Sequence, residues 1–253
     1  MPPPIKPADS LAPPDDYWSQ TRRPLVCLVF LLPWLVVYEV GVLSLGRGGA
    51  ETLRNGADVW MRSGLQQFGL HQPWLLPAVI VAGLLAWHVA GRHPAKVPFD
   101  TFPGMLAESV LFAFALVAAG QAGEVLFRAE ATRTLAASGS LAPSRMAVAL
   151  TFIGAGIYEE VLFRLCLLPA LIGVFRLSRL SPRVAAGFAV LSTSLMFSLA
   201  HHIGPGAESI GLYLFTFRTM AGVFFAALFL YRGFGITVGA HAAYDLIVGV
   251  ALT

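Results

Sequence analysis

Long apolar stretches, each about the length of a helix that crosses a bilayer, account for most of this chain. The hydrocarbon core of a bilayer is about 30 Å thick, so a helix needs roughly 20 apolar residues to span it. The stretches in this sequence are 24–45, 74–91, 104–127, 146–168, 184–200, 209–231 and 234–252. The sequence therefore predicts an all-α fold, a polytopic membrane bundle of seven or eight transmembrane helices.

The composition agrees with a lipid environment. Hydrophobic residues make up 57% of the 253 positions and charged residues only 12%, whereas soluble domains are about one quarter charged. A soluble enzyme, a disordered chain and a nucleic-acid binder built on basic patches are excluded, because too few polar side chains exist to cover a water-facing surface. We expect an integral, multi-pass protein, in the inner or plasma membrane if the source is prokaryotic, whose partners include the lipid bilayer and no nucleic acid.

The chain divides into three regions. Residues 1–23 are rich in proline and are predicted to form a flexible N-terminal tail. Residues 24–145 hold the N-terminal transmembrane helices, and the mixed charged and apolar segment 46–73 suggests an amphipathic helix on the membrane surface. Residues 146–252 form the C-terminal core. Within it, Pro169 is expected to end or kink the apolar run, so that 170–177 form a short interfacial helix or part of an eighth span.

Charged residues inside apolar stretches are the strongest functional signals, because a charge at the centre of a membrane helix costs about 2.5–3.5 kcal/mol. Glu159, Glu160 and Arg164 lie within 146–168. Residues four apart share one face of a helix, so Glu160 and Arg164 can form an ion pair. Glu159 then points elsewhere and is left for chemistry. The alternative is that all three form a structural charge cluster between helices.

Two further polar groups lie on other apolar stretches. His201 follows 184–200 and shares a face with Phe197, so the aromatic ring can pack beside the imidazole; the alternative is a pair with His202 that meets lipid headgroups. His241 and Asp245 are four apart within 234–252, among small residues that permit close helix contact. The alternative for this second pair is a hydrogen bond that only packs helices together.

Glu159, His201, His241 and Asp245 can converge in one buried pocket. A carboxylate base, an imidazole and donors for an oxyanion are the groups that activate water for hydrolysis. Histidine and carboxylate also suit zinc, but the His-Glu-x-x-His motif is absent. We therefore expect no required cofactor and leave zinc open. The remaining polar residues in or near apolar stretches are expected to anchor helix ends or pair between helices: Glu39, His88, Glu108, Glu124 and Arg218.

The three motifs, taken in order, resemble those of the CPBP family of intramembrane proteases. The family pattern is Glu-Glu-x-x-x-Arg, then Phe-x-x-x-His, then His-x-x-x-Asn or Asp, and here it covers roughly 146–252. The family includes type II CAAX prenyl endopeptidases and bacteriocin-immunity-like proteins. The resemblance implies a helical fold with a cavity open to one leaflet. It also implies hydrolysis of a peptide bond in a membrane-associated, in some cases prenylated, protein or peptide.

The resemblance also implies a role for each motif residue. Glu159 and His201 would activate the water, and His241 with Asp245 would hold the tetrahedral oxyanion. Glu160 and Arg164 would support the site. Eukaryotic-type members favour Asn at the position of Asp245, and an ionised aspartate would repel an oxyanion, so Asp245 would act protonated or by orienting His241.

Two other functions remain open from the sequence. One is a binding or bacteriocin self-immunity protein that keeps the same fold without hydrolysis. The other is a transporter that uses the charges as a proton or ion relay, although the chain shows no inverted repeat of the kind common in transporters.

Overall fold

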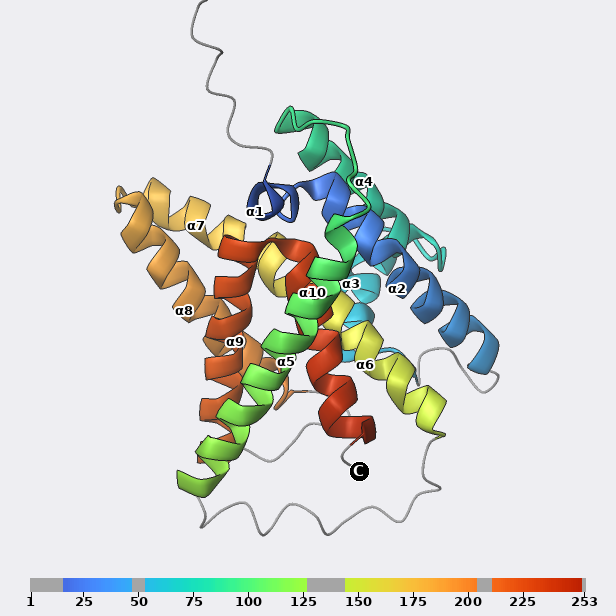
Figure 1. Ribbon diagram of the computed structural model, residues 1–253, viewed down its shortest axis with the longest axis vertical. Coiled ribbons are helices and arrows are strands. Elements are labelled where there is room, and N and C mark those ends of the chain that lie inside the picture. The colour runs from blue at the N-terminus through green and yellow to red at the C-terminus, as the bar shows by residue number, and fades with distance from the viewer. Residues whose placement is uncertain (1–15, 47–52, 127–143, 204–210, 252–253) are drawn as a thin grey trace, which may run out of the picture.

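The computed structural model describes residues 16–46, 53–126, 144–203 and 211–251 (Figure 1). Over these ranges the chain is helical and contains no strand, so the predicted all-α fold is confirmed. The helices are α1 (Tyr17–Gln20), α2 (Pro24–Leu45), α3 (Gly56–Gln66), α4 (Leu75–Ala90), α5 (Thr101–Leu126), α6 (Arg145–Glu160), η3 (Val161–Leu167), α7 (Leu168–Leu177), α8 (Pro182–Ala200), α9 (Leu212–Arg232), α10 (Phe234–Leu246) and η4 (Ile247–Ala251).

The long apolar helices match the expected membrane character. Within the described ranges, five helical segments are long and apolar enough to cross a membrane: Pro24–Leu45, Thr101–Val125, Pro182–Ala200, Leu212–Arg232 and Phe234–Ala251. Helix α4 is apolar but shorter. Length and composition thus support five of the seven or eight expected spans.

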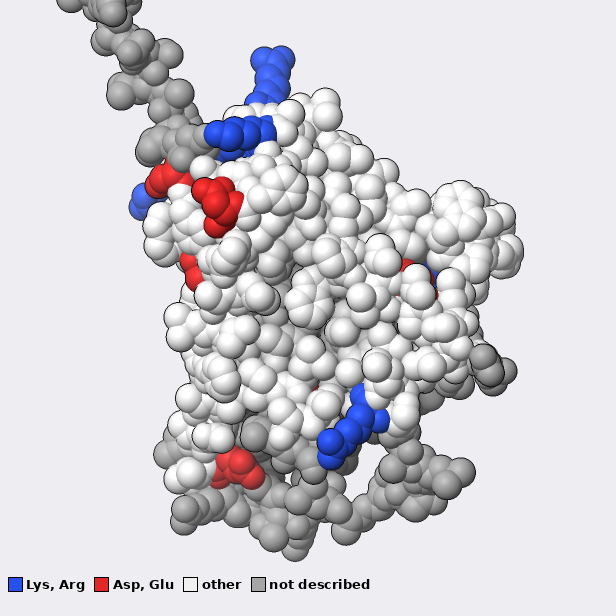
Figure 2. Space-filling model, turned by 45° about the vertical axis from the view of Figure 1, so that its right-hand side comes forward, with Lys and Arg blue, Asp and Glu red and all other residues white. Residues whose placement is uncertain are grey.

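The outer surface is mostly apolar. Figure 2 shows a broad area with few Lys, Arg, Asp or Glu side chains, and most of the coloured side chains lie towards its upper and lower ends. Val36, Val40 and Leu111 are more than half exposed on helices that carry these apolar faces. Exposed aliphatic side chains in such numbers are typical of a surface that faces lipid.

Helix α10 occupies the centre of the bundle and packs against α2, α5, α6 and α9 (Figure 1). Small residues permit this close approach, as the sequence predicted. A Cβ atom built on Gly156 of α6 would lie 2.7 Å from the Cβ of Ala242 on α10. The contact brings the backbone beside His241 against the end of α6, where the two glutamates lie.

Pro169 does not end the helical run, so of the two predicted outcomes, an end or a kink, the first is wrong. The run continues from α6 through the π-helical segment η3 into α7, with Pro169 in the first turn of α7. Proline has no N–H to donate to the carbonyl four residues earlier, and the wider π turns just before it change the local hydrogen-bond register. Such π segments are frequent at functional sites, and this one directly follows Glu160.

The segment 46–73 contains a helix, as predicted, but its charged side chains are turned into the bundle. Its helix, α3, covers Gly56–Gln66, and residues 47–52 lie outside the described residues. Arg54, Asp58 and Arg62 are buried. Their charged groups pair with one another and with Glu39 of α2, which removes the need for them to face water. The tail predicted for 1–23 is described only from residue 16, and it includes α1.

Candidate active site

Glu160 and Arg164 form the ion pair that their spacing predicts. Oε2 of Glu160 lies 3.2 Å from Nε of Arg164, and both side chains are almost fully buried. Nη2 of Arg164 donates to the carbonyl oxygen of Gly222 on α9, and its guanidinium lies 4.6 Å from the ring centre of Phe197 on α8. One buried cation thus contacts three parts of the bundle, which compensates for the cost of its burial.

His241 is held between a carboxylate and an aromatic ring. Its Nδ1 is 2.7 Å from Oε1 of Glu160. Because a carboxylate only accepts, Nδ1 carries the proton. The ring of Phe225 stacks on the imidazole with centroids 4.5 Å apart and an angle of 14° between the planes. These two contacts direct Nε2 away from Glu160, towards Glu159 and Asp245.

Glu159 points away from Glu160, as the helical geometry predicts, and faces both histidines. Its Oε2 lies 3.8 Å from Nε2 of His201 and 3.9 Å from Nε2 of His241. Neither distance is a direct hydrogen bond. Nδ1 of His201 donates to the carbonyl oxygen of Phe197 over 2.8 Å, which fixes the ring so that Nε2 faces Glu159. The Phe197 ring packs against the same imidazole, with centroids 4.9 Å apart, as its spacing predicted.

Asp245 completes the group. Its Oδ2 is 3.5 Å from Nε2 of His241. A cavity of about 450 Å³ adjoins all four side chains, Glu159, His201, His241 and Asp245. Its wall also includes aromatic and polar side chains from α3, α6, α9 and α10: Asn55, Phe152, Phe217, Arg218, Phe225 and Tyr244. The structure therefore brings together every residue that the sequence predicted for the site.

The other intramembrane polar residues take different places. Glu39 pairs with arginines of the α3 segment, and Glu108 of α5 pairs with Arg232 of α9, both as expected for contacts between helices. Arg218 lines the cavity. The ring of His88 stacks on that of His93, and Glu124 is exposed near the end of α5.

Asn55 is the cavity residue that the sequence analysis missed. Its Nδ2 donates to Oε1 of Glu159 over 3.3 Å. The sequence held one signal, since an Asn before Gly56 with an acid three residues later is typical of a helix N-cap. That signal predicts where α3 begins, but it does not indicate which group the Nδ2 atom of Asn55 contacts.

The donor set does not fit a metal site. In the described part of the chain, no group of three or more His, Cys, Asp or Glu side chains is arranged so that it could hold a metal ion. One oxygen of Glu159 is also engaged by the Asn55 amide.

The comparisons agree with the motifs. Residues 141–247 match a family model described as Rce1-like, type II CAAX prenyl endopeptidase Rce1-like. Comparisons with curated proteins and with solved structures give no match. The matched range holds both glutamates, Arg164, both histidines and Asp245, and it supports a CAAX protease-like enzyme that is integral to a membrane. The matched region is therefore similar to the family that the three motifs resemble.

Proposed function

We propose that the protein is a glutamate-type intramembrane endopeptidase that uses a water molecule activated by Glu159 and His201. The observation that carries the proposal is the position of Glu159, whose Oε2 faces Nε2 of both histidines at 3.8 and 3.9 Å. This separation suits one bridging water molecule that is hydrogen-bonded on both sides.

The proton positions favour this arrangement. Because Nδ1 of His201 donates to a backbone carbonyl, Nε2 of the neutral ring is an acceptor, like Oε2 of Glu159. Two acceptors do not bond directly, but a water molecule can donate one hydrogen to each. The lone pairs of its oxygen then remain for attack on a carbonyl carbon.

The reaction follows from these positions. Glu159 takes a proton from the water as its oxygen bonds to the carbonyl carbon of the scissile peptide. The resulting oxyanion is stabilised by hydrogen bonds from Nε2 of a protonated His241 and from the carboxyl group of a protonated Asp245. Glu159 then passes its proton to the peptide nitrogen, the C–N bond breaks, and a carboxylic acid and an amine leave.

The proposed substrate is a membrane-associated peptide or protein, prenylated or plain. The phenyl rings that line the cavity suit apolar side chains or a lipid group. The proposed protein is multi-pass, and α4 and the continuous helix Arg145–Leu167 also cross the bilayer, which gives seven spans. If the source is prokaryotic, the proposed location is the plasma membrane.

The test uses the purified, detergent-solubilised protein and internally quenched peptides with and without a farnesyl group on cysteine. We expect cleavage by the wild type and a loss in kcat of about 10²–10⁴-fold in Glu159→Gln. Glu124→Gln, which alters an exposed carboxylate outside the cavity, is the matched control. Wild-type rates in Glu159→Gln would refute the assigned base.

The same assay tests the metal-free mechanism and the non-catalytic alternative. The proposed chemistry predicts that 1,10-phenanthroline leaves kcat unchanged, and inhibition that zinc reverses would contradict it. If the wild type cleaves neither peptide set, while combined Glu159→Ala and His201→Ala substitutions leave a cellular phenotype intact, the protein is a binding or immunity protein.

A further inference from the structure

We propose that Asn55 is a positioning residue for Glu159, and that its side-chain amide holds the carboxylate facing His201 and His241. The inference rests on the proposed function, because it gives Asn55 a role in presenting the proposed base. Asn55 lies outside the matched range 141–247. The proposal therefore gives the N-terminal half of the chain a role in the site.

The two ends of the Asn55 amide have separate partners. Oδ1 accepts the backbone N–H of Asp58 over 2.9 Å, which makes Asn55 the N-cap of α3. Nδ2 donates to Oε1 of Glu159. Because the cap requires an acceptor and the carboxylate requires a donor, the orientation of the amide is determined at both ends.

This contact decides which glutamate oxygen faces the histidines. With Oε1 of Glu159 held by Nδ2, the carboxylate plane cannot turn freely, and Oε2 is the oxygen that faces the imidazoles. Asn55 is only 7% exposed, so water competes little for this hydrogen bond. An amide donor of this kind limits the carboxylate to the orientation suited to proton transfer.

Helix α3 is itself held firmly. Asp58, which is fully buried, accepts from Nη1 of Arg54 and Nε of Arg62 at 2.6 Å each, and from the hydroxyl of Tyr38 at 2.8 Å. Nη2 of Arg62 donates to Glu39 of α2 over 2.8 Å. The two arginines and two acids balance in charge, which a buried network requires.

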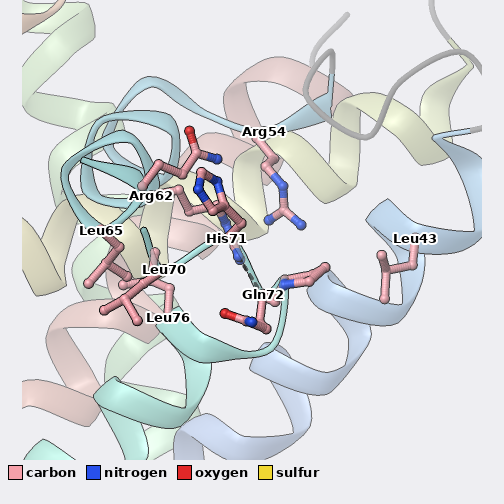
Figure 3. A pocket seen from close by; sticks show the side chains of 10 residues that line it. Leu43, Arg54, Arg62, Leu65, Leu70, His71, Gln72 and Leu76 are labelled. Carbon is pink, nitrogen blue, oxygen red and sulfur yellow. Dashed lines mark hydrogen bonds between the residues drawn. The ribbon is translucent and has the colours of Figure 1, made fainter. Parts of the chain in front are cut away.

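The last turns of α3 and the loop before α4 line a small cavity of about 100 Å³, with Arg54 and Arg62 on its wall (Figure 3). Nη1 of Arg62 donates to the carbonyl oxygen of Pro73 over 2.5 Å. Arg62 therefore joins α3, α2 and the α4 approach, and α3 has little freedom to move away from α6.

The buried network around Asp58 and Glu39 also holds the helix that carries Glu159. Tyr158, the residue before Glu159, donates its hydroxyl hydrogen to Glu39, and its ring packs against Tyr38 with centroids 5.3 Å apart. Asn55 and Glu159 are thus attached to one set of buried side chains. The hydrogen bond between them follows from how both helices are anchored.

Two substitutions separate positioning from helix capping. Asn55→Ser and Asn55→Asp keep an N-cap oxygen, and Ser, Asp and Asn cap helices about equally well. A role in capping alone predicts wild-type kcat for both. Positioning predicts that kcat falls about 10-fold in Asn55→Ser with KM unchanged. It also predicts a greater fall in Asn55→Asp, where a second carboxylate faces Glu159.

The pH–rate profile and melting temperature complete this test. In Asn55→Asp the pH–rate profile shifts along the pH axis, because a charge is added beside the base. A loss of folded protein would lower the rate by the same factor at every pH and would not shift the profile. Melting temperatures near that of the wild type would show that the cap is intact. Unchanged kcat in both variants would overturn the proposal.

A cross-linking measurement tests the contact without any activity. In a Cys27→Ala, Cys166→Ala background, Asn55→Cys with Glu159→Cys is expected to be joined in detergent by a short bifunctional maleimide. Such a reagent is used because a hydrogen bond between the tips of two side chains does not bring their Cβ atoms within the range of a disulfide. Gly64→Cys with Glu159→Cys is the spacing control, because Gly64 lies further along α3, roughly 13 Å from Asn55 along the helix axis. Gln20→Cys with Thr101→Cys, whose side chains touch at 2.7 Å, is the positive control.

The outcomes separate the two proposals. A control pair that cross-links while the 55–159 pair does not would overturn the placement of Asn55. A 55–159 cross-link, together with no cleavage of any peptide by the wild type, would refute the proposed function and with it the positioning role, while the contact itself would stand.

Discussion

Glu160 of α6 and His241 of α10 share a hydrogen bond of 2.7 Å in a fully buried position. The other oxygen of Glu160 lies 3.2 Å from Nε of Arg164. One carboxylate therefore carries both the ion pair within its helix and the contact that orients a histidine of the site. This dual role separates Glu160 from Glu159, its neighbour in the sequence.

Loss of Glu160 or Arg164 is expected to harm folding more than loss of Glu159. Glu160→Ala and Arg164→Ala each leave an unpaired buried charge, which costs about 3–5 kcal/mol. Glu159→Gln keeps the side-chain volume and unpairs no buried cation. Melting temperature and detergent-extracted yield, with Glu124→Gln as the exposed control, measure the difference. Equal values for all three variants would contradict this division of roles.

Gly156→Ala is expected to lower both stability and kcat. The added methyl group would lie 2.7 Å from the Cβ of Ala242, so α6 and α10 would have to separate, at a cost of about 1–3 kcal/mol. The same shift would move His241 relative to Glu159. Gly187→Ala, on an exposed face of α8 where the methyl group meets nothing within 4 Å, is the matched control. Melting temperature and kcat distinguish the two variants; similar behaviour of both would disprove close packing at Gly156.

Asp245→Asn is expected to keep activity, whereas Asp245→Ala loses about 10²-fold in kcat. If Asp245 serves as a protonated donor beside Nε2 of His241, the Asn amide supplies the same hydrogen bond without needing a proton. Alanine supplies none. Steady-state kinetics with the quenched peptides measure both variants. An Asn variant as slow as the Ala variant would show that Asp245 acts as a carboxylate, by orienting His241.

Arg232→Lys is expected to lower the melting temperature without changing kcat per folded molecule. Arg232 donates two hydrogen bonds to Glu108, over 2.8 and 2.7 Å, and its guanidinium lies 3.7 Å from the ring centre of Trp18. Lysine cannot form the paired hydrogen bonds, and neither Arg232 nor Glu108 lines the cavity. Arg183→Lys, on an exposed side chain, is the control. A change in kcat with unaltered melting temperature would contradict a purely structural role.

Local signals in the sequence predicted much of the helical fold. The apolar run 24–45 has the same bounds as α2, since Pro24 suits the first helical turn and the charged Arg22 and Arg23 precede it. The i, i+4 spacing predicted that Glu160 would meet Arg164 and that Glu159 would point elsewhere. Both relations depend on helical geometry within one segment.

Contacts between segments were harder to predict. The charged residues of α3 suggested a surface helix, because their partners Glu39 and Tyr38 lie on a different helix and no local pattern links them. The run through Pro169 was expected to end or kink, and it continues through π turns into α7, a hydrogen-bond register that no local pattern indicated.

The sequence by itself determined which segments are helical, that lipid is their solvent, and which ionisable groups must be buried, because these depend on local spacing and on the cost of charge in hydrocarbon. The tertiary structure alone decided that Asn55 meets Glu159 and that a neutral network anchors α3. Such contacts join residues far apart in the chain, and their geometry depends on how every helix packs against α10 and α6.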